Sequence, residues 1–459
     1  MKVKIIAPCR TDHIWKKKKT TFVFPPLALP LLASFTPPDV QVSLCDEVTQ
    51  PIDWGEEVDL VGLSVMTATA PRAYQIAQTY RARGARVIMG GIHPSVMPEE
   101  ALLHADSVAL GEVEGLWPQI IQDARDGSLK RIYRASSLPC LQGSLPLRYD
   151  LLDRRRYFIP NTVQATRGCP FDCSFCSVSA LSGKTFRHRP IPEVIRDISS
   201  LPGNFFLFVD DNLVGSHAYA RELLSALIPL RRKWVSQASI DIARDEALID
   251  LAAEAGCIGL LIGFESLSAE ILQAIGKRNN RAEEYKAMIC RIRSRGIGIQ
   301  GSFVFGFDQD DPSVFSRTAE FVEETRLDAA NFCRLTPFPG TRLFQQLETE
   351  GRILHRKWEL YDREHVVFRP KRMSPQELDE GTFWAYEKTY SLASIGRRMS
   401  PNWRHLVFYL ALNLGYLRGV SQHRKWGEPH SLAPDIPSGQ PPLSECIPSL
   451  GVKEEEVEA

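Results

Sequence analysis

The sequence predicts an α/β protein with two consecutive parallel-sheet domains and a helical C-terminal region. Strand and helix patterns alternate through the first 130 residues, restart at residue 161 for six units, and give way to a helical pattern after about residue 370. At 459 residues, with 44% hydrophobic residues, the chain is long enough for two or three domains with substantial cores.

These patterns define five expected regions. They are a doubly wound, Rossmann-like domain over residues 1–130, a linker over 131–160, a partial (β/α)6, TIM-like barrel over 161–370, a helical region over 371–430 and a disordered tail over 431–459.

Charge and composition argue against several classes of protein. Lys+Arg and Asp+Glu are 55 each, so the net charge gives no sign of a nucleic-acid partner. The N-terminal segment MKVKIIAPCR is not a signal peptide, and no uninterrupted apolar stretch of about 18 residues occurs. We therefore expect a cytoplasmic protein without a membrane-spanning helix.

In the N-terminal domain, expected strands cover residues 3–7, 40–45, 58–65, 86–89 and 107–110, and expected helices cover 26–35, 71–83, 98–104 and 116–126. Ligands of such sheets bind at the carboxyl ends of the strands. Three of these ends carry small or polar residues that let the backbone approach a flat or phosphate-bearing ligand, although glycines there are also ordinary turn residues. The candidate ligand-binding residues are Ser64, Thr67, Gly90, Gly91, His93, Gly111 and Glu112.

In the second domain, expected strands cover residues 162–166, 205–209, 235–240, 258–263, 298–304 and 329–335, with helices such as 218–230, 246–255 and 282–295 between them. Barrel enzymes place catalytic groups at the carboxyl ends of their strands.

Three of the ten cysteines, Cys169, Cys173 and Cys176, lie within eight residues, just after the first barrel strand. Three thiolates on one loop can bind three irons of a [4Fe–4S] cubane, which leaves the fourth iron open to a substrate. The alternative is a structural zinc site with His188 as the fourth ligand. The other seven cysteines are scattered singly, and we expect them to be free thiols.

The pattern Cys-x3-Cys-x2-Cys at this place resembles the radical SAM superfamily, over roughly residues 161–370. The resemblance implies that the open iron binds S-adenosylmethionine (SAM). Its reductive cleavage then yields a 5′-deoxyadenosyl radical, which abstracts a hydrogen atom. It also implies an electron donor such as flavodoxin or ferredoxin.

The resemblance extends to other strand ends and implies further SAM contacts. Asp210 and Asp211 suit the cationic SAM ammonium, unless they cap a helix. Gln237 and Ser239 suit ribose or carboxylate, although ordinary polar strand positions explain them equally well. Glu265 resembles the family's ribose or methionine contact. Ser302 lies on the strand expected to bind adenine, and residues 336–341 resemble the turn that closes the SAM pocket.

A doubly wound domain followed by such a barrel resembles the cobalamin-dependent radical SAM branch, which includes hopanoid methylases. Seven residues are then the implied cobalamin contacts: Ser64, Thr67, Gly90, Gly91, His93, Gly111 and Glu112. The chain lacks the Asp-x-His-x-x-Gly motif whose histidine binds cobalt, since neither His13 nor His93 has glycine at the needed offset. Cobalamin without a histidine ligand and a cobalamin-free relic domain are both open interpretations.

The implied reaction is radical methylation of an unactivated carbon in a small molecule or lipid. Cyclisation, carbon–carbon coupling and rearrangement are alternatives, as is a non-enzymatic zinc or nucleic-acid module. An apolar helix candidate over residues 405–417 with basic flanks suits a membrane interface, or it packs on the barrel. Residues 351–370, with Trp358, resemble relatives that act on lipids. The sequence shows no obvious general base.

Overall fold

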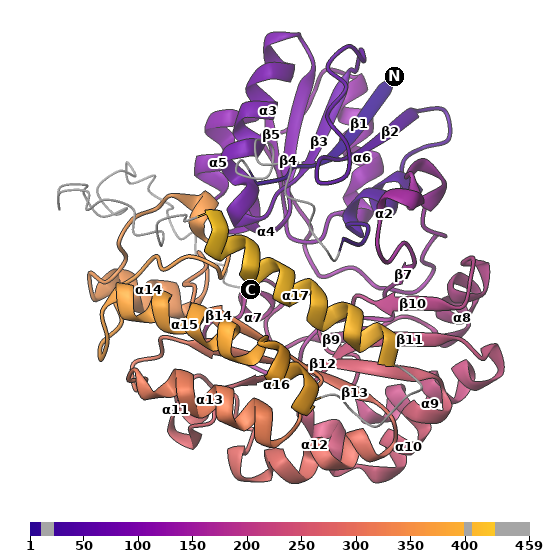
Figure 1. The fold of residues 1–459 in the computed structure, drawn as a ribbon. Helices are drawn as coiled ribbons and strands as arrows, with labels where there is room; N and C mark the ends of the chain where they lie inside the picture. Colours follow the sequence, from indigo (N-terminus) through magenta and orange to yellow (C-terminus); the bar gives the residue numbers. More distant parts are fainter. Residues whose placement is uncertain (11–22, 399–405, 427–459) are drawn as a thin grey trace, which may run out of the picture.

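The structure, a computed structural model, describes residues 1–10, 23–398 and 406–426. The N-terminal sheet and its helices lie above an open barrel in Figure 1, and the last described helix lies across the barrel. The expected tail over residues 431–459 lies outside the described residues.

The N-terminal sheet has six parallel strands in the order β2-β1-β3-β4-β5-β6. The order reverses beside β1, as in doubly wound folds. The strands are β1 (Lys2–Ala7), β2 (Gln41–Asp46), β3 (Leu60–Ser64), β4 (Arg86–Gly90), β5 (Ser107–Leu110) and β6 (Ile132–Arg134). The first five agree with the expected positions.

Helices cover both faces of this sheet. Helices α3 (Ala70–Ala82) and α5 (Pro98–His104) bury Ala73, Ile76 and Ala101 on one face. Helices α2 (Ala28–Ser34) and α6 (Trp117–Arg125) bury apolar side chains on the other face, among them Leu29, Trp117 and Ile121. The short helix α4 (Ile92–Val96) follows β4. The doubly wound prediction is confirmed.

Residues 131–160, which were expected to be a linker, form ordered structure that packs on the N-terminal domain. This segment opens with β6, which extends the first sheet, and it buries Tyr149, Leu152 and Tyr157 in the N-terminal core. The Tyr149 hydroxyl donates to the carbonyl of Thr162 at the start of the barrel, 2.8 Å away. Aromatic side chains with a bonded hydroxyl are well suited to such burial, so the segment attaches the two domains to each other.

The second sheet is an open barrel of six parallel strands in the order β14-β13-β12-β11-β10-β7. Its strands are β7 (Thr162–Val163), β10 (Phe205–Phe208), β11 (Lys233–Ala238), β12 (Cys257–Glu265), β13 (Gly298–Phe305) and β14 (Ala329–Arg334). The partial barrel is confirmed. The first expected strand is wrong in one respect, because it divides into β7 and β8 (Thr166–Gly168), and β8 pairs antiparallel with β9 (Phe186–His188).

Side chains alternate between the two faces of the barrel strands. On β12, Leu260, Ile262 and Phe264 pack under the surrounding helices, whereas Leu261 and the glycines beside it occupy the opposite, inner face. The helices between strands are α8 (Ile191–Ser200), α9 (His217–Leu227), α10 (Glu246–Glu254), α11 (Ala269–Ala274), α12 (Tyr285–Ser294), α13 (Ser313–Glu324) and α14 (Arg342–Thr349).

The C-terminal region consists of helices α15 (Pro375–Thr389), α16 (Leu392–Arg398) and α17 (Leu406–Trp426). Helix α17 packs on the barrel through Tyr409, whose hydroxyl donates to the carbonyl of Ile258. A Cβ at Gly259 or Gly298 would come within 2.6 Å and 2.0 Å of this tyrosine, so the two glycines make room for it. The expectation that this helix packs on the barrel is confirmed.

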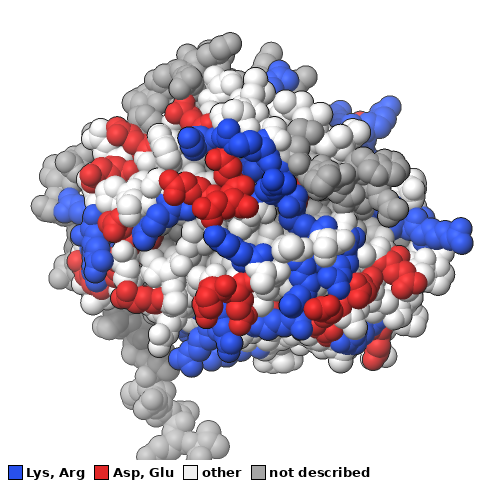
Figure 2. All heavy atoms as spheres, turned by 60° about the horizontal axis from the view of Figure 1, so that its bottom comes forward, with Lys and Arg blue, Asp and Glu red and all other residues white. Residues whose placement is uncertain are grey.

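No helix among the described ranges is both long enough and apolar enough to cross a bilayer. On the face shown in Figure 2, Lys and Arg side chains lie interspersed with Asp and Glu. That pattern agrees with the balanced charge of the sequence.

Candidate active site

The loop of three cysteines lies between β8 and α7 (Ser177–Ser182), shortly after the first barrel strand, β7. Cys169 and Cys176 are half-buried and Cys173 is buried, and all three are free thiols. Gly168 precedes them with φ of 82°, and a Cβ there would lie 2.2 Å from the carbonyl of Thr185. Only glycine fits this close approach of backbone to backbone.

The three thiols interact electrostatically with one another. Burial, against the opposing charge of Lys277, raises the pKa of Cys173 to about 12, and the nearby Cys176 and Cys169 contribute to this rise. Burial also raises the pKa of Cys169, against the effect of Asn212, whose amide lies 3.9 Å from its sulfur. A bound metal must therefore displace protons from these thiols, which iron does by forming strong thiolate bonds.

The donor set fits a cubane better than a single ion. In a cubane each thiolate binds a different iron, so the sulfurs need not converge on one point. Within the ranges that the structure describes, no three His, Cys, Asp or Glu side chains converge as one zinc ion requires. The proposed fourth zinc ligand, His188, is exposed and stacks on Tyr219 with ring centroids 4.3 Å apart.

Asp210 holds the bend between β7 and β8. Its carboxylate accepts from the backbone N–H groups of Ala165, at 3.1 Å, and Thr166, at 2.5 Å, and from the Thr166 hydroxyl, at 2.6 Å. Burial raises its pKa to about 7. This side chain is 3% exposed and its oxygens accept from the backbone and the Thr166 hydroxyl that shape the cysteine loop, and its predicted contact with SAM stays a prediction.

Asp211 and its neighbours lie beside the same loop. Asp211 accepts from the N–H of Gly168 at 2.9 Å, and its carbonyl accepts from the amide of Gln237 at 2.8 Å. Asn212 accepts from the N–H and hydroxyl of Ser239, which is 9% exposed. The helix-cap alternative is wrong, because Ser216 caps α9. The side chain of Gln237 is exposed, and the SAM contacts expected for Asp211, Gln237 and Ser239 stay predictions.

Glu265 ends β12 in a left-handed conformation, with φ of 64°, and pairs with Lys277 at 2.5 Å. Burial opposes the charge of Lys277, but Glu265 and the thiol of Cys173 raise its pKa. A largely buried cation, with a side chain that is 12% exposed, therefore lies beside the cysteine loop. Sequence reasoning missed Lys277, since it lies on no strand end. Ser302 lies next to Gly263 in the strand register, and its predicted contact stays a prediction.

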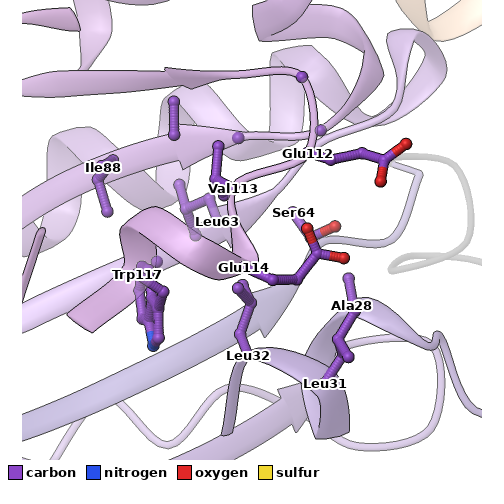
Figure 3. Close-up of a pocket in the computed structure, with 15 residues that line it drawn as sticks. Ala28, Leu31, Leu32, Leu63, Ser64, Ile88, Glu112, Val113, Glu114 and Trp117 are labelled. Atoms are coloured by element: carbon purple, nitrogen blue, oxygen red, sulfur yellow. The ribbon is translucent and has the colours of Figure 1, made fainter. Parts of the chain in front are cut away.

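A pocket opens at the carboxyl ends of β3, β4 and β5 (Figure 3). The carboxylates of Glu112 and Glu114 point the same way, away from Ile88 and Trp117. Five of the seven residues expected to bind cobalamin line it, namely Ser64, Gly90, Gly91, Gly111 and Glu112. The glycines and the apolar side chains of α2 and α6 make a cradle that suits a large, flat ligand.

The other two residues expected to bind cobalamin, Thr67 and His93, do not line this pocket, and their contacts stay predictions. Thr67 is 4% exposed. His93 is fully buried, and its Nε2 lies 3.0 Å from the hydroxyl of Tyr74, which donates to Glu100. The indole N–H of Trp358 donates to the same glutamate at 2.9 Å. His93 therefore belongs to the contact between the domains.

Residues 351–370 also belong to this contact between the two domains. Besides Trp358, Asp362 of this segment pairs with Arg10 of the N-terminal domain at 2.5 Å. Val367 and Tyr361 pack with Trp358 in a small apolar cluster that Met97 of the first domain joins. The segment thus holds the two domains together.

An ionic bridge joins the pocket to the cysteine loop. Arg167, two residues before Cys169, pairs with Glu112 at 2.7 Å and also with Glu114. Arg187 on β9 pairs with Glu112 as well. Burial alone would raise the pKa of Glu112, but Arg187 and Arg167 hold it below its usual range. Sequence reasoning missed both arginines, because nothing local shows which residues they face.

Two families match the two domains. Residues 163–322 match the radical SAM superfamily, and residues 39–121 match the B12 binding domain. The chain is 32% identical to the bacteriochlorophyllide d C-12(1)-methyltransferase of Chlorobaculum tepidum over 401 residues, which cover 84% of this chain and 87% of that protein. This chain belongs to the cobalamin-dependent radical SAM enzymes.

Other members agree with this assignment. The bacteriochlorophyllide d C-8(2)-methyltransferase of the same organism is 30% identical over 437 residues, or 91% of this chain and 97% of that one. The methyltransferase TsrM of Kitasatospora setae, solved with cobalamin and a [4Fe-4S] cluster bound, shares the fold with a TM-score of 0.66. It is 16% identical, and the match covers 92% of this chain and 99% of that one. From the two matching families and the relative at 32% identity, the cofactors of this enzyme are a [4Fe–4S] cluster, SAM and cobalamin, and the non-enzymatic alternative is wrong.

Proposed function

We propose that this radical SAM enzyme transfers a methyl group to an unactivated carbon of a large, mostly apolar organic substrate. The ionic bridge from Glu112 and Glu114 to Arg167 carries the proposal. Through it, the residues of the N-terminal pocket directly contact those of the cysteine loop. A methyl carrier and a radical generator must cooperate on one substrate, and this contact fixes their two binding sites relative to each other.

We infer that Cys169, Cys173 and Cys176 hold the cluster and that the pocket holds cobalamin. When bound, the cluster supplies the electron that cleaves SAM, and cobalamin supplies the methyl group. The exposed side chain of Gln237 and the carboxylate of Asp211 lie where they suit the polar groups of SAM.

Lys277 and Glu265 complete this set of polar residues. Lys277 is the largely buried cation beside Cys173, and it suits the SAM carboxylate. Glu265 keeps Lys277 in place through their ion pair. Hydrogen abstraction by a carbon radical needs no general base, which agrees with a site built of binding groups.

The substrate proposal rests on the relatives and on the barrel lining. The relatives at 32% and 30% identity are named for bacteriochlorophyllide d, so a ring system of that kind is the first candidate. A hopanoid-like lipid, implied by the sequence resemblance, is the second. Leu261 and Val304 project half-buried from the inner faces of β12 and β13, where an apolar ring system would find apolar contacts.

The decisive experiment is anaerobic reconstitution of the full chain with iron, sulfide and cobalamin, followed by incubation with SAM and reductant. Bacteriochlorophyllide d and a hopanoid are offered in parallel reactions. We expect a product that is heavier by one methylene unit and carries the label of methyl-deuterated SAM. SAM cleavage with a product of unchanged carbon count would instead favour cyclisation or rearrangement.

Membrane contact is a separate proposal. Val407 and Leu414 of α17 are 82% and 45% exposed, on the side of the helix away from Tyr409. We expect these side chains to give a weak peripheral contact with lipid. Flotation with anionic vesicles tests it. Binding that is unchanged in a Val407→Ser/Leu414→Ser variant would reject it.

A further inference from the structure

The outer side of the cysteine loop is a surface of exposed cations. Asp172, immediately before Cys173, pairs with Arg342 at 2.8 Å and with Lys184 at 3.0 Å. The side chains of Lys184 and Arg342 are 66% and 56% exposed. Lys184 and Arg342 thus flank the carboxylate of Asp172, next to Cys173, which is a proposed ligand of the cluster. Two positive charges beside one negative charge leave a net positive charge here.

A third exposed cation, Arg278, lies in the segment that follows α11 and packs on the cysteine loop. Gly276 has φ of 79°, and a Cβ there would lie 2.6 Å from the carbonyl of Asp172. The N–H of Ser174 donates to the carbonyl of Ile275 at 3.0 Å. Arg278 follows Gly276 by two residues, so its backbone lies close to the cysteine loop.

The two sides of the cysteine loop therefore have different surroundings. On the side of Arg167 the cations pair with Glu112 and Glu114 of the N-terminal domain. On the side of Asp172 the side chains of Lys184 and Arg342 are exposed, as is that of Arg278 in the segment that packs on the loop. A protein that binds there comes within one residue of Cys173.

We propose that Lys184, Arg278 and Arg342 form the docking surface for a small acidic electron-donor protein, of the flavodoxin or ferredoxin class. Each reductive SAM cleavage uses one electron; it leaves the reduced donor, which is oxidised, and enters the enzyme at the cysteine loop. Electron-transfer complexes are small and transient, so a few exposed charges suffice to orient them. The inference rests on the proposed SAM cleavage but not on the identity of the methyl acceptor.

Binding of oxidised bacterial flavodoxin to the anaerobically purified full chain, measured by calorimetry, tests this surface without turnover. We expect the dissociation constant to rise steeply with ionic strength. A Lys184→Glu/Arg278→Glu variant should bind about tenfold or more weakly and lose most of the salt dependence. Arg342 is left intact because it also holds the carbonyl of Asp172.

The control variant is Arg155→Glu/Arg397→Glu, which reverses two cations that are 91% and 57% exposed on other elements. We expect it to bind flavodoxin like the wild type. If flavodoxin binding weakened equally in both variants, or did not weaken in Lys184→Glu/Arg278→Glu, the proposed docking surface would be wrong.

Two further measurements separate this proposal from misfolding and from failure of the proposed function. Carbodiimide cross-linking of the wild type to flavodoxin should join a donor carboxylate to Lys184, and cross-links only to other lysines would count against the surface. With titanium(III) citrate as reductant, the Lys184→Glu/Arg278→Glu variant should form 5′-deoxyadenosine at the wild-type rate. A loss of this chemical activity together with flavodoxin binding would mean that the residues shape the cysteine loop instead.

Discussion

The cysteine loop and the N-terminal pocket meet at one ionic bridge, but they are built in different ways. The loop takes its donors from a segment of eight residues and holds them with the carboxylates of Asp210 and Asp211. The pocket takes its lining from three strand ends and from α2 and α6, which are far apart in the sequence, and four of its fifteen lining residues are glycine. Function therefore depends on side chains in the loop and, at these glycines, on the absence of side chains in the pocket. Removing atoms should damage the first, and adding atoms should damage the second.

The largest effect is expected for Cys173→Ala. One of three iron ligands is lost, so the cluster should not assemble, and iron content and 5′-deoxyadenosine formation should fall to background. Cobalamin uptake should persist, because no pocket residue changes. Cys290→Ala is the matched control, since that thiol is exposed and lies outside the loop. A brown, SAM-cleaving Cys173→Ala protein would show that the cluster has other ligands.

Gly91→Ala is the corresponding test of the pocket. Gly91 has φ of 102°, and a Cβ there would lie 2.7 Å from the carbonyl oxygen of Val65. Strain of about 1–3 kcal/mol must be relieved by moving the loop, so we expect cobalamin affinity to fall about tenfold or more while iron content is retained. Spectrophotometric titration measures the affinity.

The control for this variant is Gly115→Ala, because a Cβ at Gly115 meets nothing within 4 Å. Its cobalamin affinity should equal that of the wild type. Unchanged affinity in Gly91→Ala would mean that the pocket does not depend on this close backbone approach, and the contrast between the two sites would fail.

Arg167→Gln tests the bridge between the two sites. The change leaves Glu114 without the guanidinium that pairs with it and removes one of two partners of Glu112. We expect the ratio of 5′-deoxyadenosine to methylated product to rise severalfold, because radical formation continues while the two binding sites lose their alignment. Arg167→Lys keeps the charge but not the planar fork, so its ratio should be intermediate. If the ratio of 5′-deoxyadenosine to methylated product were unchanged in Arg167→Gln, the bridge would only stabilise the fold and would not align the two sites.

The two regions also differ in how much the sequence predicted. The cysteine spacing and the strand alternation are local patterns, and both led to the correct fold and family. The same reasoning did not show that His93 and Asp210 are buried, because an ionisable residue at a strand end looks the same whether it faces a ligand or the protein interior. Lys277, Arg167 and Arg187 were missed, since their partners lie 12, 53 and 75 residues away along the chain. The two arginine contacts depend on how the domains pack, and the Lys277 contact depends on how the segment after α11 folds back onto β12. No local pattern encodes either.

The smallest effect we predict concerns the acid dependence of the bridge. Arg187 and Arg167 hold the pKa of Glu112 below its usual range, against the effect of burial. A carboxyl with a lowered folded-state pKa stabilises the protein above its unfolded pKa, and this contribution is lost as the pH falls through the folded value. The melting temperature of the wild type should therefore exceed that of Glu112→Gln by a few degrees at neutral pH. The difference should shrink only when the pH drops below the ordinary range of glutamate. A difference that stays constant into acid would mean that Glu112 contributes through packing and not through its charge, and the link between pocket and loop would then be steric.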